Sequence, residues 1–473
     1  MVFALGVMLT ACEKKVVDLQ PIDDIPSNVA IQNMNDVTNA LNGVYGTWSA
    51  RRSVYVSALI SDEVRLGTGA EYRNVGNILF NWNHVSDSQD WRDAETGGIW
   101  TNLYFVIDRV NRLLEFMAAV VPANATEDAL KTQYRGELLA LRAMAHLELL
   151  RNFSITPEYT ADRLGVPLMI EYVKAPGSFK KERNTQGDVI AQINTDLATA
   201  RTLIPTTFTD IGRVTRNAVI ATQARSAMHT KNWQGVVDRA SEVIALQPIS
   251  TGATYAAIWT TRTLASNQNT EVIWKLNIQS SNLGSAIGSL FQDVGTGAVQ
   301  AAPSQKLLNT FNQGSDLRFP IFFRTSPRNL IAKYGVVIGS NGENFQYDIK
   351  MIRTSELLLA RAEAYAELNQ ITQSNTDLAT LRTARIDGYA HTVITDKATL
   401  ITAILQERYK ELCFEGQRYY DLKRRSLPIV RDLSDVNGLT AIQTLPATDF
   451  RYILPIPQQE KFANPIITQN PGY

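Results

Sequence analysis

Four histidines are the residues of this 473-residue chain best suited to bind a metal or move a proton at neutral pH. His84, His146, His229 and His391 lie far apart, and none has a second ligand at the spacing that zinc sites use. His146 and His229 stand inside helical patterns, which favours core histidines with satisfied hydrogen bonds over metal ligands. The sequence therefore predicts no metal site and no cofactor.

Other catalytic combinations are equally weak. Ser178 and Lys181 match the S-x-x-K spacing of a β-lactamase nucleophile, but they lie in a predicted loop without the companion motifs. Glycoside hydrolysis needs only two carboxylates, and the sequence cannot place two of them across a cleft. Residues 432–438 resemble a weak calcium loop, although a plain turn is favoured. No recognisable catalytic motif remains, so we expect a protein that is not an enzyme.

Residues 71–98 combine aromatic rings with polar side chains in the least regular part of the N-terminal half. Trp82 and Trp91 both lie here, and a loop tryptophan exposes apolar area unless it covers something. Sugars present C–H faces that stack on rings, and their hydroxyls need a few fixed polar partners. The loop therefore predicts a binding surface, with packing of both tryptophans into the core as the alternative.

Several classes of protein are excluded by composition. Lys and Arg together number 46, as do Asp and Glu, so the formal net charge is zero. No basic field exists to attract nucleic acid, and no polybasic cluster marks a membrane surface. No apolar run reaches the roughly 18 to 20 residues of a spanning helix. With 45% apolar residues, the chain can bury a large core.

The N-terminus predicts a lipid anchor. An apolar run ends at Leu9-Thr10-Ala11-Cys12, which is similar to a bacterial lipoprotein box with an acylated cysteine. We expect residues 1–11 to be the signal peptide, with a charged start lying upstream because no Lys or Arg precedes the run. Residues 12–30 contain little that could pack and predict a tether. Cys413 lies among apolar residues and predicts a buried thiol rather than a disulfide.

An ion network is predicted around residues 401–425. Glu407, Glu411 and Glu415 lie four apart and would stack as like charges on one helix face, so cations must neutralise them. Gly416 then supplies a left-handed helix end. The expected partners are the cations nearest in sequence: Arg408, Arg418, Lys423, Arg424 and Arg425.

Helical periodicity dominates the rest of the chain. It covers residues 37–48, 51–69, 99–118, 131–153, 188–203, 217–228 and 233–246. Residues 214–247 and 355–388 form two units of 34 residues, the tetratricopeptide period, and neither fits the full consensus. Residues 248–352 are rich in glycine and predict short strands at 271–276 and 347–352. Prolines in residues 450–473 predict an extended tail that wraps the body.

Motifs spread along the chain resemble the SusD/RagB family of outer-membrane nutrient-binding lipoproteins. The pattern ER-x-x-EL-x-FEG-x-R-x-x-DLKR at residues 407–424 is similar to its C-terminal signature. The segment W-x-x-x-Y-x-x-I-x-x-x-N-x-LL from residue 100, ELLLARAEAYAEL from residue 356, and the ending NP-x-x-x-QNPGY also resemble it. The resemblance implies an all-α fold of tetratricopeptide-like hairpins with a loop-rich portion that contains short strands.

The same resemblance implies a function. A lipid-anchored protein on the cell surface would bind an oligosaccharide and deliver it to a SusC-like TonB-dependent outer-membrane barrel. Ligand contacts are expected from the irregular loops, at Trp82, Asn83, Trp91, Arg92, Tyr72 and Arg73, with Phe291 as a weaker candidate. The implied division is an N-terminal helical region at residues 31–250 and a C-terminal region with the ligand-facing insert at residues 251–473.

Three alternatives remain open from the sequence. Members of the family also take up peptides, which a charged cleft with few exposed rings would favour. A surface glycosidase could use a carboxylate pair, and a helical-repeat scaffold could bind only protein, here the barrel itself.

Overall fold

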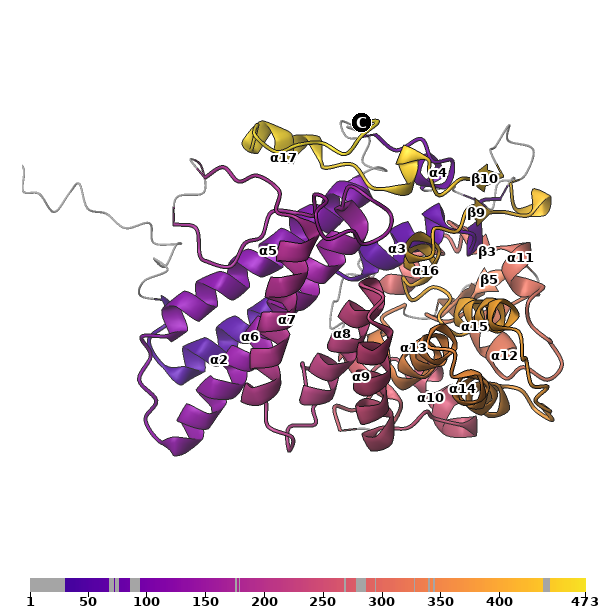
Figure 1. The fold of residues 1–473 in the computed structure, drawn as a ribbon, viewed down its shortest axis with the longest axis horizontal. Coiled ribbons are helices and arrows are strands. Elements are labelled where there is room, and N and C mark those ends of the chain that lie inside the picture. The colour runs from indigo at the N-terminus through magenta and orange to yellow at the C-terminus, as the bar shows by residue number, and fades with distance from the viewer. Residues whose placement is uncertain are drawn as a thin grey trace, which may run out of the picture.

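Helices form most of the structure (Figure 1), and several of them begin at capping side chains. The side chain of Asn33 accepts the Asp36 amide and the Asp36 carboxylate accepts the Asn33 amide, which closes a capping box. Thr185 and Asp188 form a second box. The computed structural model describes residues 30–67, 72, 76–85, 94–174, 177, 179–267, 269–277, 286–293, 295–326, 328–338, 341–342, 345–436 and 443–473.

The N-terminal region carries the longest helices. Its helices are α2 (Met34–Thr47), α3 (Arg51–Ile60), α4 (Asn77–Phe80), α5 (Ala94–Met117), α6 (Ala125–Phe153), α7 (Gln186–Leu203), α8 (Arg216–His229) and α9 (Trp233–Leu246). Those of the C-terminal region are α10 (Gly252–Thr260), α11 (Gln305–Leu308), α12 (Arg318–Phe322), α13 (Thr354–Glu367), α14 (Ile371–Arg385), α15 (Lys397–Glu411), α16 (Arg418–Arg424) and α17 (Gln458–Ala463).

Neighbouring helices pack as hairpins in a row. Helix α6 packs on α7, α8 on α9 and α13 on α14, and α9 of one hairpin packs on α13 of the next. The last two hairpins coincide with the predicted 34-residue units, so the tetratricopeptide-like all-α body is confirmed. Small residues allow the close approach, because a Cβ on Gly136 of α6 would lie 2.8 Å from Cγ1 of Ile204.

Among the described residues, five pairs of short antiparallel strands form small sheets. The predicted strands at 271–276 and 347–352 pair with each other as β2 and β8, with Val272 opposite Arg353. The strands are β1 (Val64–Arg65), β2 (Val272–Leu276), β3 (Ala302–Pro303), β4 (Phe323–Arg324), β5 (Leu330–Ile331), β6 (Val337–Ile338), β7 (Asn341–Gly342), β8 (Ile349–Arg353), β9 (Ile429–Val430) and β10 (Thr444–Leu445).

The C-terminal tail crosses the top of the molecule in Figure 1, over the end of the N-terminal helices. The prediction that residues 450–473 are extended throughout is wrong. Helix α17 begins directly after Pro457 and ends at Ala463, before Pro465, so the prolines bound the helix. A proline at a helix start costs no hydrogen bond, because the first amides have no partner within the helix.

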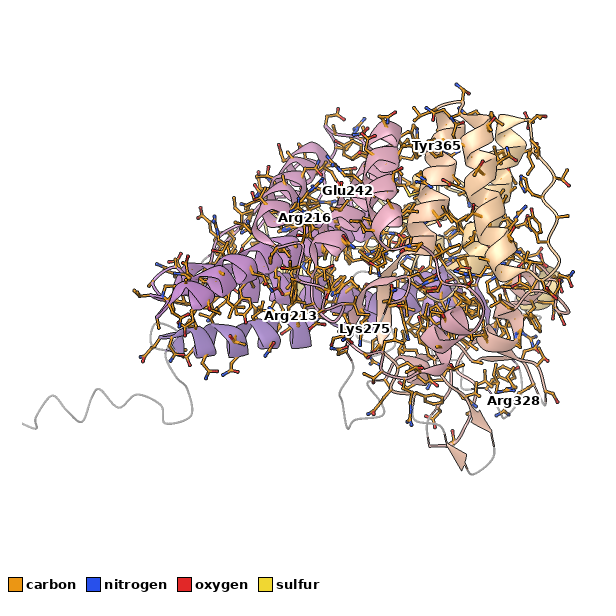
Figure 2. All side chains as sticks on the ribbon, turned by 90° about the horizontal axis from the view of Figure 1, so that it is seen from below. Arg213, Arg216, Glu242, Lys275, Arg328 and Tyr365 are labelled. Atoms are coloured by element: carbon orange, nitrogen blue, oxygen red, sulfur yellow. The ribbon has the colours of Figure 1, made fainter. Side chains whose placement is uncertain are left out.

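One hydrophobic core runs from Met34 to Ile467 and includes side chains of both predicted regions, 31–250 and 251–473. Ion pairs also tie the fold together. Arg213 and Lys275, labelled in Figure 2, pair with Glu137 at 2.8 Å and with Asp348 at 2.6 Å respectively. Within the described part of the chain, none of the helices has the length and apolar character that crossing a bilayer requires.

The glutamates of the predicted charge stripe are buried and paired with arginines. Glu411 Oε1 lies 2.8 Å from Arg353 Nη1, and Glu411 Oε2 lies 3.1 Å from Arg318 Nη1 and from Arg385 Nε. Burial opposes ionisation of Glu411, yet the arginines hold the pKa of this carboxyl well below its ordinary value. Arg318 and Arg382 neutralise Glu407 in the same way, and Lys333 and Arg353 neutralise Glu415.

The prediction that Arg408, Arg418, Lys423, Arg424 and Arg425 neutralise the stripe is wrong, although one other cation close in sequence, Lys410, lies 3.5 Å from Glu407. The helix ends at Glu411, and Phe414 and Gly416 then turn through left-handed backbone with φ of 60° and 76°. This turn directs the nearby cations to other acceptors. Arg408 and Arg424 pair with Asp421, Arg424 also with Glu363, Arg418 with Asp62, Arg425 with Glu367, and Lys423 donates to backbone carbonyls.

Candidate functional site

Trp82 does not present its ring to a ligand. It follows α4 in left-handed backbone, with φ of 54°, and none of its side chain is exposed. Its indole N–H donates to the Ile60 carbonyl at 2.9 Å, and the Arg431 guanidinium lies 4.2 Å from the ring centroid. The prediction that Trp82 contacts a ligand is therefore wrong for this structure, because the indole completes the packing beneath the loop.

Phe291 is a second correction. Its ring is buried against Tyr55, Tyr334 and Phe414, at centroid distances of 6.2, 6.4 and 5.6 Å. A ring enclosed by three others has no free face for a sugar. The glycine-rich sequence around Phe291 predicted an accessible loop, but aromatic packing between distant segments holds the side chain inside.

The structure describes only some of the remaining residues that were predicted to contact a ligand. Asn83 is exposed beside the buried Trp82, and Tyr72 is half-buried, with its backbone bridged to Val299. The predicted positions Arg73, Trp91 and Arg92 and the lipidation site Cys12 lie outside the described residues.

A groove of about 390 Å³ lies along α5, between that helix, residues 167–181 and the tail helix α17. This volume is in the range of small-ligand clefts, which combine apolar walls with a few polar groups. Four aromatic side chains line it: Trp100, Tyr104, Phe105 and Phe179. Its charged lining residues are Asp108, Glu171, Lys181 and Glu460.

Two of these rings are fixed and form the floor of the groove. Trp100 packs edge-on against Phe153 at 5.1 Å, and its indole N–H donates to Glu460 at 3.1 Å. The Tyr104 hydroxyl donates to the Pro167 carbonyl at 2.8 Å. Trp100 itself is almost completely buried. The hydrogen bonds join α5 to both other walls, so the groove is rigid.

The other two rings are open to solvent. Phe105 is 49% exposed, with the Arg109 guanidinium 4.4 Å from its centroid, and Phe179 is 39% exposed. Exposed rings beside a rigid hollow offer faces on which a sugar can stack. Sequence reasoning missed both, although Phe105 is an apolar residue off the core stripe of its helix, which was the available signal.

Polar contacts hold the walls in place. Asn111 of α5 donates to the carbonyls of Met169 and Glu171 at 3.1 and 3.2 Å. Asn464, which follows α17, donates to the Lys181 carbonyl at 2.7 Å and accepts the Lys181 amide at 3.2 Å. These amide side chains are committed to the backbone. The groove can therefore recognise hydroxyls chiefly through its carboxylates and the lysine.

Neither of two other hollows suits a sugar as well. A broad hollow of about 1320 Å³ along α14 is lined by a mixture of threonines and aliphatic side chains, and its two rings, Tyr389 and His391, are hydrogen-bonded to each other at 3.0 Å. A cavity of about 30 Å³ between α8 and α16 holds about two water molecules and is too small for a sugar ring.

Histidine chemistry is absent from the groove. Burial lowers the pKa of His84 to about 4, and of His146 and His229 to about 3, so these imidazoles are neutral at pH 7. His146 is hydrogen-bonded at both ring nitrogens, as predicted, whereas Nε2 of His229 has no hydrogen-bond partner among the described residues. Among the described residues, no three His, Cys, Asp or Glu side chains are grouped as metal ligands.

Comparisons with known proteins agree with the fold. A model described as "SusD family" matches residues 324–473, and one described as "Starch-binding associating with outer membrane" matches residues 18–228. A SusD superfamily protein from Bacteroides thetaiotaomicron superposes with a TM-score of 0.78 at 22% identity, over 93% of this chain and 100% of that one. A SusD-like carbohydrate binding protein from Bacteroides vulgatus superposes with a TM-score of 0.75 at 20% identity, over 92% of this chain and 98% of that one.

Curated relatives match over shorter stretches. One SusD-like protein of Formosa agariphila is 23% identical over 252 residues, which is 52% of this chain and 43% of the relative. A second from the same species is 30% identical over 154 residues, or 30% of this chain and 29% of the relative. The chain thus spans less than half the length of these relatives. Since the two family models together match residues 18–228 and 324–473, the protein belongs to the SusD/RagB family.

Proposed function

We propose that this protein binds an oligosaccharide in the groove along α5 and delivers it to a SusC-like TonB-dependent outer-membrane barrel. The observation that carries the proposal is the pair of half-exposed rings, Phe105 and Phe179, in a rigid groove with charged groups at its rim. Stacking on such rings and hydrogen bonding to Asp108 or Lys181 hold a sugar without altering it. The family descriptions and the carbohydrate-binding relative support this choice of ligand.

Loop residues predicted from the sequence complete the proposed site. Trp91 and Arg92 directly precede α5, the helix that lines the groove. We keep them as proposed contacts, together with Tyr72, Arg73 and Asn83. Capture requires no chemical step, so the proposed activity is binding and release rather than catalysis.

The proposed location is the outer face of the outer membrane, with the chain held by lipid on Cys12. One acyl chain binds membranes only marginally, whereas two or more anchor stably, at about 0.8 kcal/mol for each buried methylene. In cells that label lipoproteins with a fatty-acid analogue, the wild type takes up label and the Cys12→Ala variant does not. If the Cys12→Ala variant still took up the label, the lipid would be attached at a residue other than Cys12.

The groove is tested by calorimetric titration against a panel of oligosaccharides. Phe105→Ala and Phe179→Ala are each expected to weaken binding about tenfold, because loss of a stacking ring costs about 1.4 kcal/mol. Phe462→Ala is the matched control, since this ring on α17 is 76% exposed and does not line the groove. Trp91→Ala tests the loop separately. Unchanged affinity in both groove variants would remove the groove from the proposal.

A peptide is the second candidate ligand, because the groove carries Asp108, Glu171 and Lys181 beside its rings. Binding of a peptide library with no binding of glycans would replace the sugar by a peptide. Release of shortened products from labelled oligosaccharides would instead indicate a glycosidase. Co-purification of a barrel from detergent-solubilised outer membranes tests the partner, and its absence would contradict the proposed delivery.

A further inference from the structure

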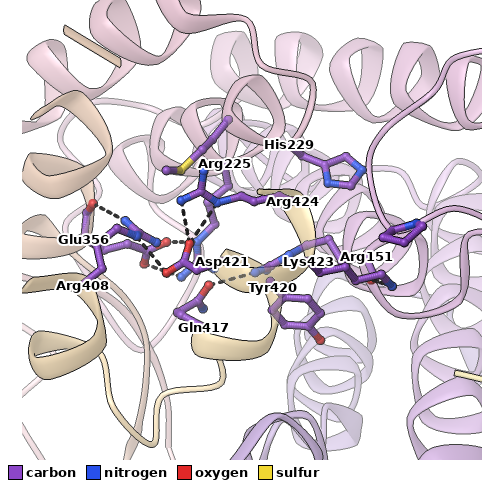
Figure 3. Close-up of a pocket in the computed structure, with 12 residues that line it drawn as sticks. Arg151, Arg225, His229, Glu356, Arg408, Gln417, Tyr420, Asp421, Lys423 and Arg424 are labelled. Carbon is purple, nitrogen blue, oxygen red and sulfur yellow. Dashed lines mark hydrogen bonds and ion pairs between the residues drawn. The ribbon is translucent and has the colours of Figure 1, made fainter. Parts of the chain in front are cut away.

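A small charged cavity lies where five helices meet, and none of its lining residues lines the groove. Figure 3 shows its lining, which comes from α6, α8, α13, α15 and α16. Its volume is about 30 Å³, which accommodates about two water molecules or one small ion. Five cationic side chains line the cavity but only two carboxylates, Glu356 and Asp421. This imbalance in the interior requires an explanation, since buried charges are normally paired.

Each guanidinium at the cavity has a carboxylate partner. Arg225 contacts Glu356 at 2.6 Å, and Arg408 contacts Asp421 at 2.9 Å (Figure 3). Arg424 also pairs with Asp421, and it and Arg151 each have a carboxylate partner outside the cavity lining. Arg424 contacts Glu363 at 2.6 Å, and Arg151 contacts Glu148 at 3.3 Å. The arginines are therefore compensated.

Lys423 is the exception. Its side chain is 2% exposed, and its ammonium donates to the carbonyls of Arg151 at 2.6 Å and Asn152 at 3.3 Å. Among the described ion pairs, none includes Lys423. Two carbonyl dipoles do not compensate a full positive charge, and one of the three ammonium protons has no acceptor among these contacts. Burial and the nearby Arg151 accordingly lower the pKa of Lys423 to about 7.

His229 supplies a second, independent feature of the cavity. Its Nε2 atom is buried without a hydrogen-bond partner among the described residues, and the residue lines the cavity. Burial and the charges of Arg151, Lys423 and Arg424 keep this imidazole neutral. In the tautomer with hydrogen on Nε2, the ring has a donor and no acceptor to receive it. The cavity lining thus contains a ring nitrogen without a hydrogen-bond partner among the described residues and an ammonium without a carboxylate partner.

We propose that the cavity binds one small monovalent anion, chloride, held by Lys423 and His229. A halide supplies the single negative charge that the cationic lining lacks, and its size suits a volume that a tetrahedral sulfate or phosphate would exceed. The anion would join α6 and α8 of the N-terminal region to α13, α15 and α16 of the C-terminal region. Its role would be structural and separate from ligand capture in the groove.

Crystals soaked in bromide provide the direct test. Bromide replaces chloride and gives an anomalous signal, so an anomalous peak is expected within hydrogen-bonding distance of Lys423 Nζ and His229 Nε2. Ordered water at this position, with no anomalous peak, would overturn the proposal and leave Lys423 neutral. This measurement uses the wild-type chain and does not depend on the folding of a variant.

Thermal unfolding in matched salts provides the second test. At equal ionic strength, the melting temperature is expected to be roughly 2 °C higher in chloride than in gluconate, because an ion that binds only the folded state stabilises it. Lys423→Met should lose this difference. Lys174→Met is the control, since that ammonium is 75% exposed, and it should keep the difference. An equal chloride effect in Lys423→Met would exclude the proposed site.

Discussion

Replacing Glu411 by glutamine tests whether the buried ion network holds the C-terminal region together. Glu411 is fully buried and contacts Arg318, Arg353 and Arg385, which come from α12, β8 and α14. Glu411→Gln keeps the size of the side chain but removes its charge and one acceptor oxygen. Three guanidiniums would then share a neutral amide whose NH₂ group is itself a donor.

The expected cost follows from these contacts. At about 4 Å between charge centres and an effective dielectric constant of about 20, each attraction contributes about 4 kcal/mol. Removing the charge from water costs several kcal/mol, and each arginine keeps another carboxylate, since Asp316, Glu271 or Glu415 remains in contact. The net loss is therefore well below the gross attraction. We expect Glu411→Gln to lower the free energy of unfolding by about 3–5 kcal/mol.

Thermal unfolding followed by circular dichroism measures this loss. For a chain of this length, it corresponds to a decrease in melting temperature of roughly 3–5 °C. Glu242→Gln is the matched control, because Glu242 makes a two-oxygen contact with Arg201 at 2.7 and 2.8 Å but is about one-third exposed. An exposed pair contributes about 0–1 kcal/mol. Equal decreases in the two variants would refute the reasoning that burial gives Glu411 its importance.

Three further predictions concern other buried side chains. Trp82→Ala should lower the free energy of unfolding by about 3–5 kcal/mol in chemical denaturation, and Trp82→Phe by less, because the indole fills the core. Burial, with the charge of Asp62, raises the pKa of Glu63 to about 8, so folded Glu63 holds a proton that the unfolded chain releases. The free energy of unfolding should therefore fall as pH rises from about 4.3 to 8, and Glu63→Gln should be more stable than wild type at pH 9. Burial opposes ionisation of Asp421, but Arg408 and Arg424 lower its pKa to about 2, so stability should decrease as pH falls from about 4 to 2, less steeply in Asp421→Asn.

Local patterns predicted the helices well because periodicity and caps act over a few residues. The predicted helices at 188–203 and 233–246 correspond to α7 and α9 almost residue for residue. The two strands of the β2–β8 pair were also predicted from alternation, although their pairing joins segments far apart in the chain. The features that failed depend on partners distant in sequence.

Trp82 illustrates this limit. Whether a loop tryptophan is exposed depends on what covers it, and here the cover includes Arg431 from the opposite end of the chain. The glutamate stripe is a second case, because the need for cations was evident from the sequence but Arg318 and Arg353 could not be assigned to it. The groove could not be predicted from local sequence, because its three walls come together only in the folded chain. The local sequence signal for it was Phe105, an apolar residue on the polar side of α5.

The ion pairs between the two regions also constrain how such chains can be recombined. Asp62, just after α3, forms an ion pair with Arg418 at 2.8 Å, and Arg225 of α8 forms one with Glu356 of α13 at 2.6 Å. A chimaera that joins residues 31–250 to the C-terminal region of a relative would separate the members of these pairs. Each separated member would be a solitary charge in the interior, so exchanges must carry both partners or neither.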